Sequence, residues 1–132
     1  MILVDTCILI DVINEDAEWC EPSCAALDEW GRRGPVLVNP IIYAEVSPGF
    51  EHPAALDEVL ETVGVEFREL PREALFLAAR AHRAYRHRGG LRIAVLPDFF
   101  IGAHALTLGV PVLTRDPTRY RAYFPTLRVA AP

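Results

Sequence analysis

Short apolar runs that are followed by helix-forming segments constrain the fold of this chain more than any other feature. Such runs lie at residues 2–5, which end on an acid, at 36–38 and at 110–114. Strands that are apolar at successive positions have both faces buried, as parallel strands covered by helices do. With further strands expected at 65–69 and 127–130, the pattern predicts a three-layer α/β/α fold around a mainly parallel sheet of about four to five strands.

The segments between these runs carry the start and stop signals of helices. Thr6 is a candidate cap for the first helix, and Asn39 followed by Pro40 combines a cap with a favoured first helical position. Glycine at position 109 is expected to end the last long helix. The expected helices span residues 7–13, 18–33, 40–46, 53–62, 71–88 and 97–108, with a short helical turn after Pro117.

The size and composition of the chain predict one domain over residues 1–132. Hydrophobic residues make up 52% of the sequence and charged residues 23%, which excludes a disordered chain. No apolar run approaches the roughly 18 to 20 residues of a membrane-spanning helix, so we expect a cytoplasmic protein without membrane partners. The three cysteines form an odd set without zinc-finger spacing, which argues against a disulfide framework.

The charged residues exclude one class of chemistry and argue against one mode of nucleic-acid binding. The 13 basic residues are all arginine and are outnumbered by 18 acidic residues, for a formal net charge of −5. Because lysine is absent, Schiff-base and lysine general-base chemistry are excluded. The negative balance also argues against a protein that coats duplex nucleic acid by broad counterion release.

Four acidic residues are expected near one edge of the predicted sheet. Asp5 closes the first strand and Asp116 follows the strand at 110–114, while Glu45 and Asp98 lie on helices that begin near the same edge. Ligands of open α/β sheets bind outside the carboxyl ends of the strands. Converging carboxylates repel one another, and a hard divalent ion such as Mg²⁺, or Mn²⁺ in a similar site, relieves that repulsion. The sequence therefore predicts a metal site at this edge.

Four short segments, in this order and spacing, resemble the PIN-domain ribonucleases and, within them, the VapC toxins of type II toxin–antitoxin modules. The segments are ILVDTC at 2–7, YAEV at 43–46, LPDFFIGAHA at 96–105 and LTRD at 113–116. The resemblance spans the whole chain and implies a PIN-like fold that cleaves RNA with one or two Mg²⁺ or Mn²⁺ ions per active site. Metal-activated water would attack the phosphodiester. The resemblance also implies inhibition by a cognate VapB-type antitoxin, and a homodimer.

The resemblance implies roles for individual residues. It implies that Asp5, Glu45, Asp98 and Asp116 are the acids of the active site. Our hypothesis is that Asp5, Asp98 and Glu45 hold one metal, and that Asp116 helps to position a second ion or the attacking water. Thr114 matches the family's small polar residue that hydrogen-bonds within this pocket, whereas Cys7 stands where serine or asparagine is often found. From the residues themselves, we consider Arg86, Arg88 and Arg115 as candidate RNA-binding groups, since guanidinium suits phosphate.

Other readings of the sequence stay open at this stage. The chain could be a PIN-type nuclease of RNA processing or DNA repair that works without an antitoxin, or a catalytically silent PIN-like binding module. An aspartyl-nucleophile phosphatase also places an aspartate after its first strand, but it needs a second aspartate where Cys7 stands. We assign no histidine to catalysis, and we expect the acidic stretch from Asp11 to Glu18 to form a solvated helix face.

Overall fold

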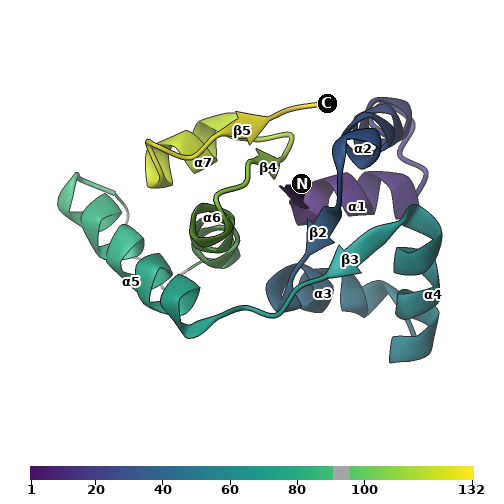
Figure 1. Cartoon of the computed structure of the whole chain (residues 1–132), viewed down its shortest axis with the longest axis horizontal. Helices are drawn as coiled ribbons and strands as arrows, with labels where there is room; N and C mark the ends of the chain where they lie inside the picture. The colour runs from purple at the N-terminus through teal and green to yellow at the C-terminus, as the bar shows by residue number, and fades with distance from the viewer. Residues whose placement is uncertain (91–95) are drawn as a thin grey trace.

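Five parallel strands form the centre of the molecule in the computed structural model, which describes residues 1–90 and 96–132 (Figure 1). They lie in the order β3-β2-β1-β4-β5, and every neighbouring pair is parallel. The strands are β1 (Ile2–Val4), β2 (Val36–Val38), β3 (Val65–Phe67), β4 (Val112–Leu113) and β5 (Val129–Ala130). The predicted parallel sheet of four to five strands is therefore confirmed.

Helices cover both faces of this sheet and complete the three predicted layers (Figure 1). On one side lie α1, α2 and α4, and on the other α5, α6 and α7, while α3 packs against both α1 and α6. The helices are α1 (Thr6–Ile13), α2 (Cys20–Arg33), α3 (Pro40–Val46), α4 (Pro53–Val63), α5 (Arg72–His87), α6 (Pro97–Leu108) and α7 (Pro117–Tyr123), with a 3-10 turn η1 (Ser47–Gly49). No helix of the described residues is long and apolar enough to cross a membrane.

The direction in which the strands are added to the sheet reverses at β1. From β1 the chain moves outward to β2 and β3, and then returns to place β4 on the opposite side of β1. In doubly wound sheets, such a reversal opens a crevice at the carboxyl ends of the two central strands, where ligands bind. Val4 pairs with Leu113 in register, so the residues that follow β1 and β4 emerge side by side.

The central strands and α6 form the core. Ile2, Leu3 and Val4 are fully buried, as the continuous apolar run predicts. α6 is buried along most of its length, and its Phe99 ring stacks on Tyr123 of α7 with centroids 4.2 Å apart. His104, also on α6, is buried, and its Nδ1 lies 3.2 Å from the side-chain amide of Asn39, which makes it a structural residue.

Two local details differ from the sequence predictions. The cap of α1 is Asp5, whose carboxylate accepts the amide of Thr6, so Thr6 is the first helical residue. α2 begins at Cys20, two residues later than predicted. The reason is Asp16, whose Oδ1 accepts the backbone amides of Glu18 and Trp19 and fixes that segment as a turn ahead of the helix.

Candidate active site

Asp5 lies at the centre of the candidate site, at the end of β1. Its backbone amide donates to the carbonyl of Leu113 at 2.9 Å, which extends the pairing with β4 by one residue. Its Oδ1 accepts the amide of Thr6 at 2.8 Å, and its Oδ2 accepts the hydroxyl of Thr114 at 2.7 Å. The Cys7 thiol lies 3.5 Å from the same Oδ2. Asp5 is only 8% exposed, so these contacts hold its carboxylate in one orientation.

Thr114 connects two of the predicted acids. Its side chain is fully buried at the end of β4. While its Oγ1 donates to Asp5, the same oxygen accepts the backbone amide of Asp116 at 3.0 Å. One hydroxyl thus fixes both the carboxylate of Asp5 and the start of the turn that carries Asp116.

Glu45 approaches from α3 and is an exposed residue, whereas Asp5 and Asp98 are each only 8% exposed. Its Oε2 accepts the hydroxyl of Thr6 at 2.5 Å. Partial burial raises the pKa of Glu45, the Thr6 hydrogen bond lowers it, and the negative charges of Asp5 and Asp98 raise it. Glu45 therefore lies close enough to two of the other acids for their negative charges to act on it, as expected of converging carboxylates.

Asp98 and Asp116 are joined by an arginine that sequence reasoning did not identify. Asp98 is in the first turn of α6, where the helix dipole favours a negative charge. Its Oδ2 lies 2.7 Å from Nη1 of Arg119, whose Nε lies 3.2 Å from Oδ2 of Asp116. Oδ1 of Asp116 caps α7 by accepting the Arg119 backbone amide at 3.1 Å.

The local environment shifts the pKa values of several groups in this cluster. Burial raises the pKa of Asp98, the Arg119 hydrogen bond opposes that shift, and the negative charge of Asp5 adds to it. Burial also raises the pKa of the Tyr120 phenol well above its usual range, with further contributions from the charges of Asp5 and Asp98. The same negative charges of the cluster therefore act on both Asp98 and Tyr120.

The oxygen ligands of the site suit a hard divalent cation, but the carboxylates are not arranged around one common point. Within residues 1–90 and 96–132, no three carboxylates, histidines or cysteines are grouped as a metal-binding set. The acids are directed instead to Thr6, Thr114 and Arg119. The Tyr120 hydroxyl is buried beside Asp5 and Asp98. The carboxylate oxygens of these acids are the ligands that a hydrated Mg²⁺ or Mn²⁺ ion prefers.

The candidate RNA-binding arginines occupy different surroundings. Arg86 is exposed on α5, whereas Arg88 donates to the carbonyl of Ala122 at 2.8 Å and ties the end of α5 to α7. Arg115 pairs with Asp11, with Nε 3.1 Å from Oδ2, and its guanidinium lies over the Trp19 ring. RNA binding by these three residues stays a prediction.

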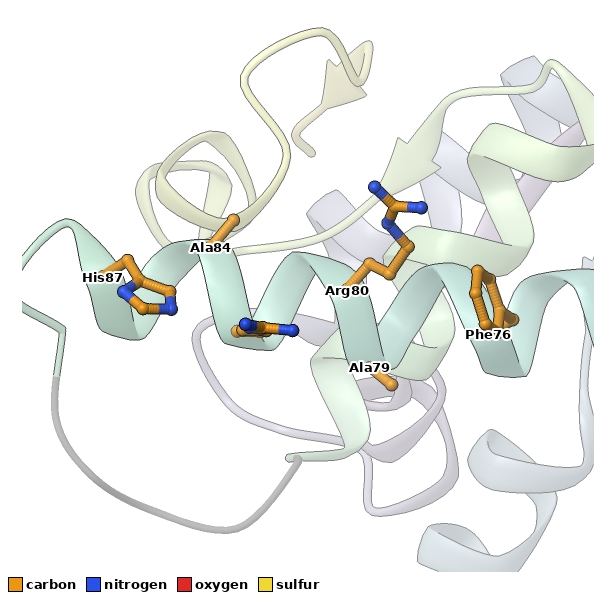
Figure 2. Close-up of a pocket in the computed structure, with 6 residues that line it drawn as sticks. Phe76, Ala79, Arg80, Ala84 and His87 are labelled. Atoms are coloured by element: carbon orange, nitrogen blue, oxygen red, sulfur yellow. The ribbon is translucent and has the colours of Figure 1, made fainter.

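A basic pocket lies along α5, next to the arginines that the sequence suggested. It has a volume of about 710 Å³ (Figure 2). Its lining includes Phe76, Arg80, Arg83 and His87, and the guanidinium of Arg80 lies 5.8 Å from the Phe76 ring centroid. Cationic and aromatic groups thus share one helix face.

The expectation that the acidic stretch from Asp11 to Glu18 forms a solvated helix face is wrong for Asp11, which is buried. It is 1% exposed, and its Oδ2 accepts the hydroxyl of Ser23 at 2.7 Å and pairs with Arg115. Ser23 and Arg115 are far from Asp11 in the sequence, so no local sequence pattern predicts these two contacts. The network anchors the turn between Thr114 and Asp116 to α1 and α2.

Comparisons with known proteins agree with this architecture. The family model for the PIN domain matches residues 2–125. The VapBC2 complex of Rickettsia felis, solved on a promoter DNA fragment, aligns with a TM-score of 0.78 at 18% identity and covers 99% of this chain and 98% of that chain. FitAB bound to the IR36 DNA fragment aligns with a TM-score of 0.74 at 24% identity, covering 100% and 95% of the two chains.

A third solved structure, VapBC-1 of nontypeable Haemophilus influenzae, aligns with a TM-score of 0.73 at 19% identity over 99% of this chain and 98% of that chain. No curated protein matches the sequence. At these identities the structures show a shared fold, while the family model covers nearly the whole chain. The resemblance found in the sequence is thus confirmed: the chain belongs to the PIN-domain family.

Proposed function

We propose that this protein is a VapC-like toxin: a Mg²⁺- or Mn²⁺-dependent endoribonuclease that is inhibited by a cognate VapB-type antitoxin. The observation that carries the proposal is the position of four carboxylates around the carboxyl ends of β1 and β4, with Asp5 hydrogen-bonded at their centre. Membership of the PIN family supports nuclease activity. The similar structures from Rickettsia felis and Haemophilus influenzae are VapBC complexes, which supports the toxin assignment.

In this proposal the chain's own residues prepare the site for metal and substrate. Asp5, Asp98 and Glu45 would hold one ion, and Asp116 would position a second ion or the attacking water. Thr114 keeps Asp5 and Asp116 in a fixed relation through one hydroxyl. The chemistry that a divalent ion would supply when held by these residues is a deprotonated water near neutral pH and neutralisation of charge on the phosphodiester. A protein nucleophile is then unnecessary.

The proposed partners follow from the same comparisons. The similar structures include the VapBC2 and FitAB assemblies and a toxin–antitoxin complex from Klebsiella pneumoniae, so we propose an antitoxin whose segment reaches the acidic site of this chain. We further propose a homodimer. RNA would be held near the site by the exposed arginines Arg86, Arg88 and Arg115.

The test is cleavage of total cellular RNA by the purified, antitoxin-free protein with Mg²⁺, with Mn²⁺ and with EDTA. Asp5→Asn and Asp98→Asn keep the side-chain shape and remove the charge, so each should abolish cleavage while circular dichroism shows a folded protein. Asp28→Asn removes one exposed carboxylate on α2 and serves as the matched control.

Discrete fragments that disappear with EDTA and with both site variants would support the metal nuclease. Cleavage retained by Asp5→Asn would contradict the site assignment. A folded, antitoxin-free protein that cleaves no RNA under any condition would favour a catalytically silent binding module instead.

A further inference from the structure

Arg119 places its guanidinium between two of the acids that the proposed function assigns to metal. Nη1 lies 2.7 Å from Oδ2 of Asp98, and Nε lies 3.2 Å from Oδ2 of Asp116. These acids come from different elements, since Asp98 begins α6 and Asp116 caps α7. A single planar cation therefore bridges two segments that would otherwise bring like charges together.

The bridge uses oxygens that a divalent ion would also need. With Arg119 in this position, no group of three carboxylates in the described part of the chain is arranged to hold a metal. A guanidinium and a metal ion that share Oδ2 of Asp98 repel each other, so the binding of one weakens the binding of the other. The arrangement is thus suited to the metal-free protein.

The side chain of Arg119 is free to leave this position. It is 51% exposed, whereas that of Asp98 is 12% exposed, so the arginine can move into solvent while the acid stays in place. The cap of α7 does not depend on that side chain, because Asp116 Oδ1 accepts the backbone amide of Arg119. Moving or replacing the guanidinium therefore leaves the start of α7 intact.

We propose that Arg119 is an internal counter-cation that neutralises Asp98 and Asp116 in the metal-free protein and competes with the divalent ion for them. This inference rests on the metal dependence in the proposed function. It makes Arg119 a positioning residue that sets how readily the site takes up metal. Metal uptake then requires the guanidinium to leave both carboxylates.

The experiment is calorimetric titration of the full-length, antitoxin-free protein with Mn²⁺, comparing wild type, Arg119→Gln and Arg121→Gln. Arg121 is an exposed arginine on the same helix, so its replacement removes the same charge without touching the bridge. Arg119→Gln should bind Mn²⁺ roughly ten-fold more tightly than wild type, which corresponds to about 1.4 kcal/mol. Arg121→Gln should stay within about two-fold of wild type.

A second readout needs no metal. In EDTA, Arg119→Gln should melt roughly 4 °C below Arg121→Gln, because Asp98 and Asp116 then repel each other without a counter-charge. Saturating Mn²⁺ should remove that difference. Arg119→Lys keeps the charge but cannot bridge both carboxylates as a fork, so its Mn²⁺ affinity should fall between those of wild type and Arg119→Gln.

The outcomes separate this inference from the proposed function. Equal Mn²⁺ affinity in all variants would overturn the competition and leave the metal nuclease standing. Absence of Mn²⁺ binding in every variant would overturn both. Tighter binding by Arg119→Gln together with its lower melting temperature in EDTA would establish Arg119 as the competitor.

Discussion

Replacing Thr114 by valine removes one hydroxyl from the centre of the site with almost no change of shape. That hydroxyl donates to Oδ2 of Asp5 at 2.7 Å and accepts the amide of Asp116 at 3.0 Å. A hydrogen bond to a charged group contributes about 1.5–3 kcal/mol, and a neutral one about 0.5–1.5 kcal/mol. The added methyl group returns up to about 0.8 kcal/mol through burial. We therefore expect Thr114→Val to lower the free energy of unfolding by about 2–3 kcal/mol.

The measurement is urea denaturation in EDTA, followed by circular dichroism, for wild type, Thr114→Val and Thr114→Ser. Serine keeps the hydroxyl and loses only a methyl group, so its cost should be about 1 kcal/mol. If Thr114→Val proves no less stable than Thr114→Ser, the hydroxyl does not hold the site together and the reasoning is wrong.

Three further predictions concern the surroundings of the site. Asp11→Asn should lower the free energy of unfolding, measured by urea denaturation, by about 1–3 kcal/mol, because it breaks an ion pair with Arg115 in which the acid is buried and the arginine one-third exposed. A loss of stability no larger than that of Asp28→Asn would contradict this. Gly102→Ala should destabilise the protein by about 1–2 kcal/mol, since a Cβ there would lie 2.3 Å from the buried Phe124 ring. Gly31→Ala on α2, where a Cβ has no neighbour within 4 Å, should stabilise the protein by about 0.5–1 kcal/mol. Two effects of the same sign would refute the packing argument. Burial, with a smaller effect from Arg68, lowers the pKa of His104, so the unfolded state binds more protons and stability is lost as pH falls from about 7 through that lowered pKa. His104→Gln should reduce this loss of stability in thermal melts at several pH values, with the exposed His87→Gln as control. An unchanged dependence on pH would disprove the argument.

The strands and three of the four acids could be located from the sequence because their signals are local. A run such as Ile2–Val4 is apolar at every position, and the acid that ends it must lie at the edge of a parallel sheet. Asp98 and Asp116 follow equally visible boundaries. Glu45 lies within a helix that begins near the same edge, which is a weaker signal than the end of a strand, and the family resemblance strengthened its selection.

The ion pairs around the site could not be predicted in full, because they join distant segments. Arg119 follows Asp116 by one helical turn, which predicts that half of the bridge, but Asp98 is 21 residues away and no spacing points to it. Asp11 was wrongly expected in solvent for the same reason. Its partners, Ser23 and Arg115, come from α2 and from the turn after β4.

The hydrogen bond between Thr114 and Asp5 spans 109 residues of sequence, and β1 is enclosed by β4 only when the carboxyl-terminal part of the chain is present. Contacts of such long range form late, since the intervening chain must first be ordered. A nascent chain on the ribosome therefore carries Asp5 without Thr114, Asp116 or Arg119 until more than a hundred further residues have been made. The acid cluster forms only after the segment that carries these three residues has emerged and folded onto the first strand.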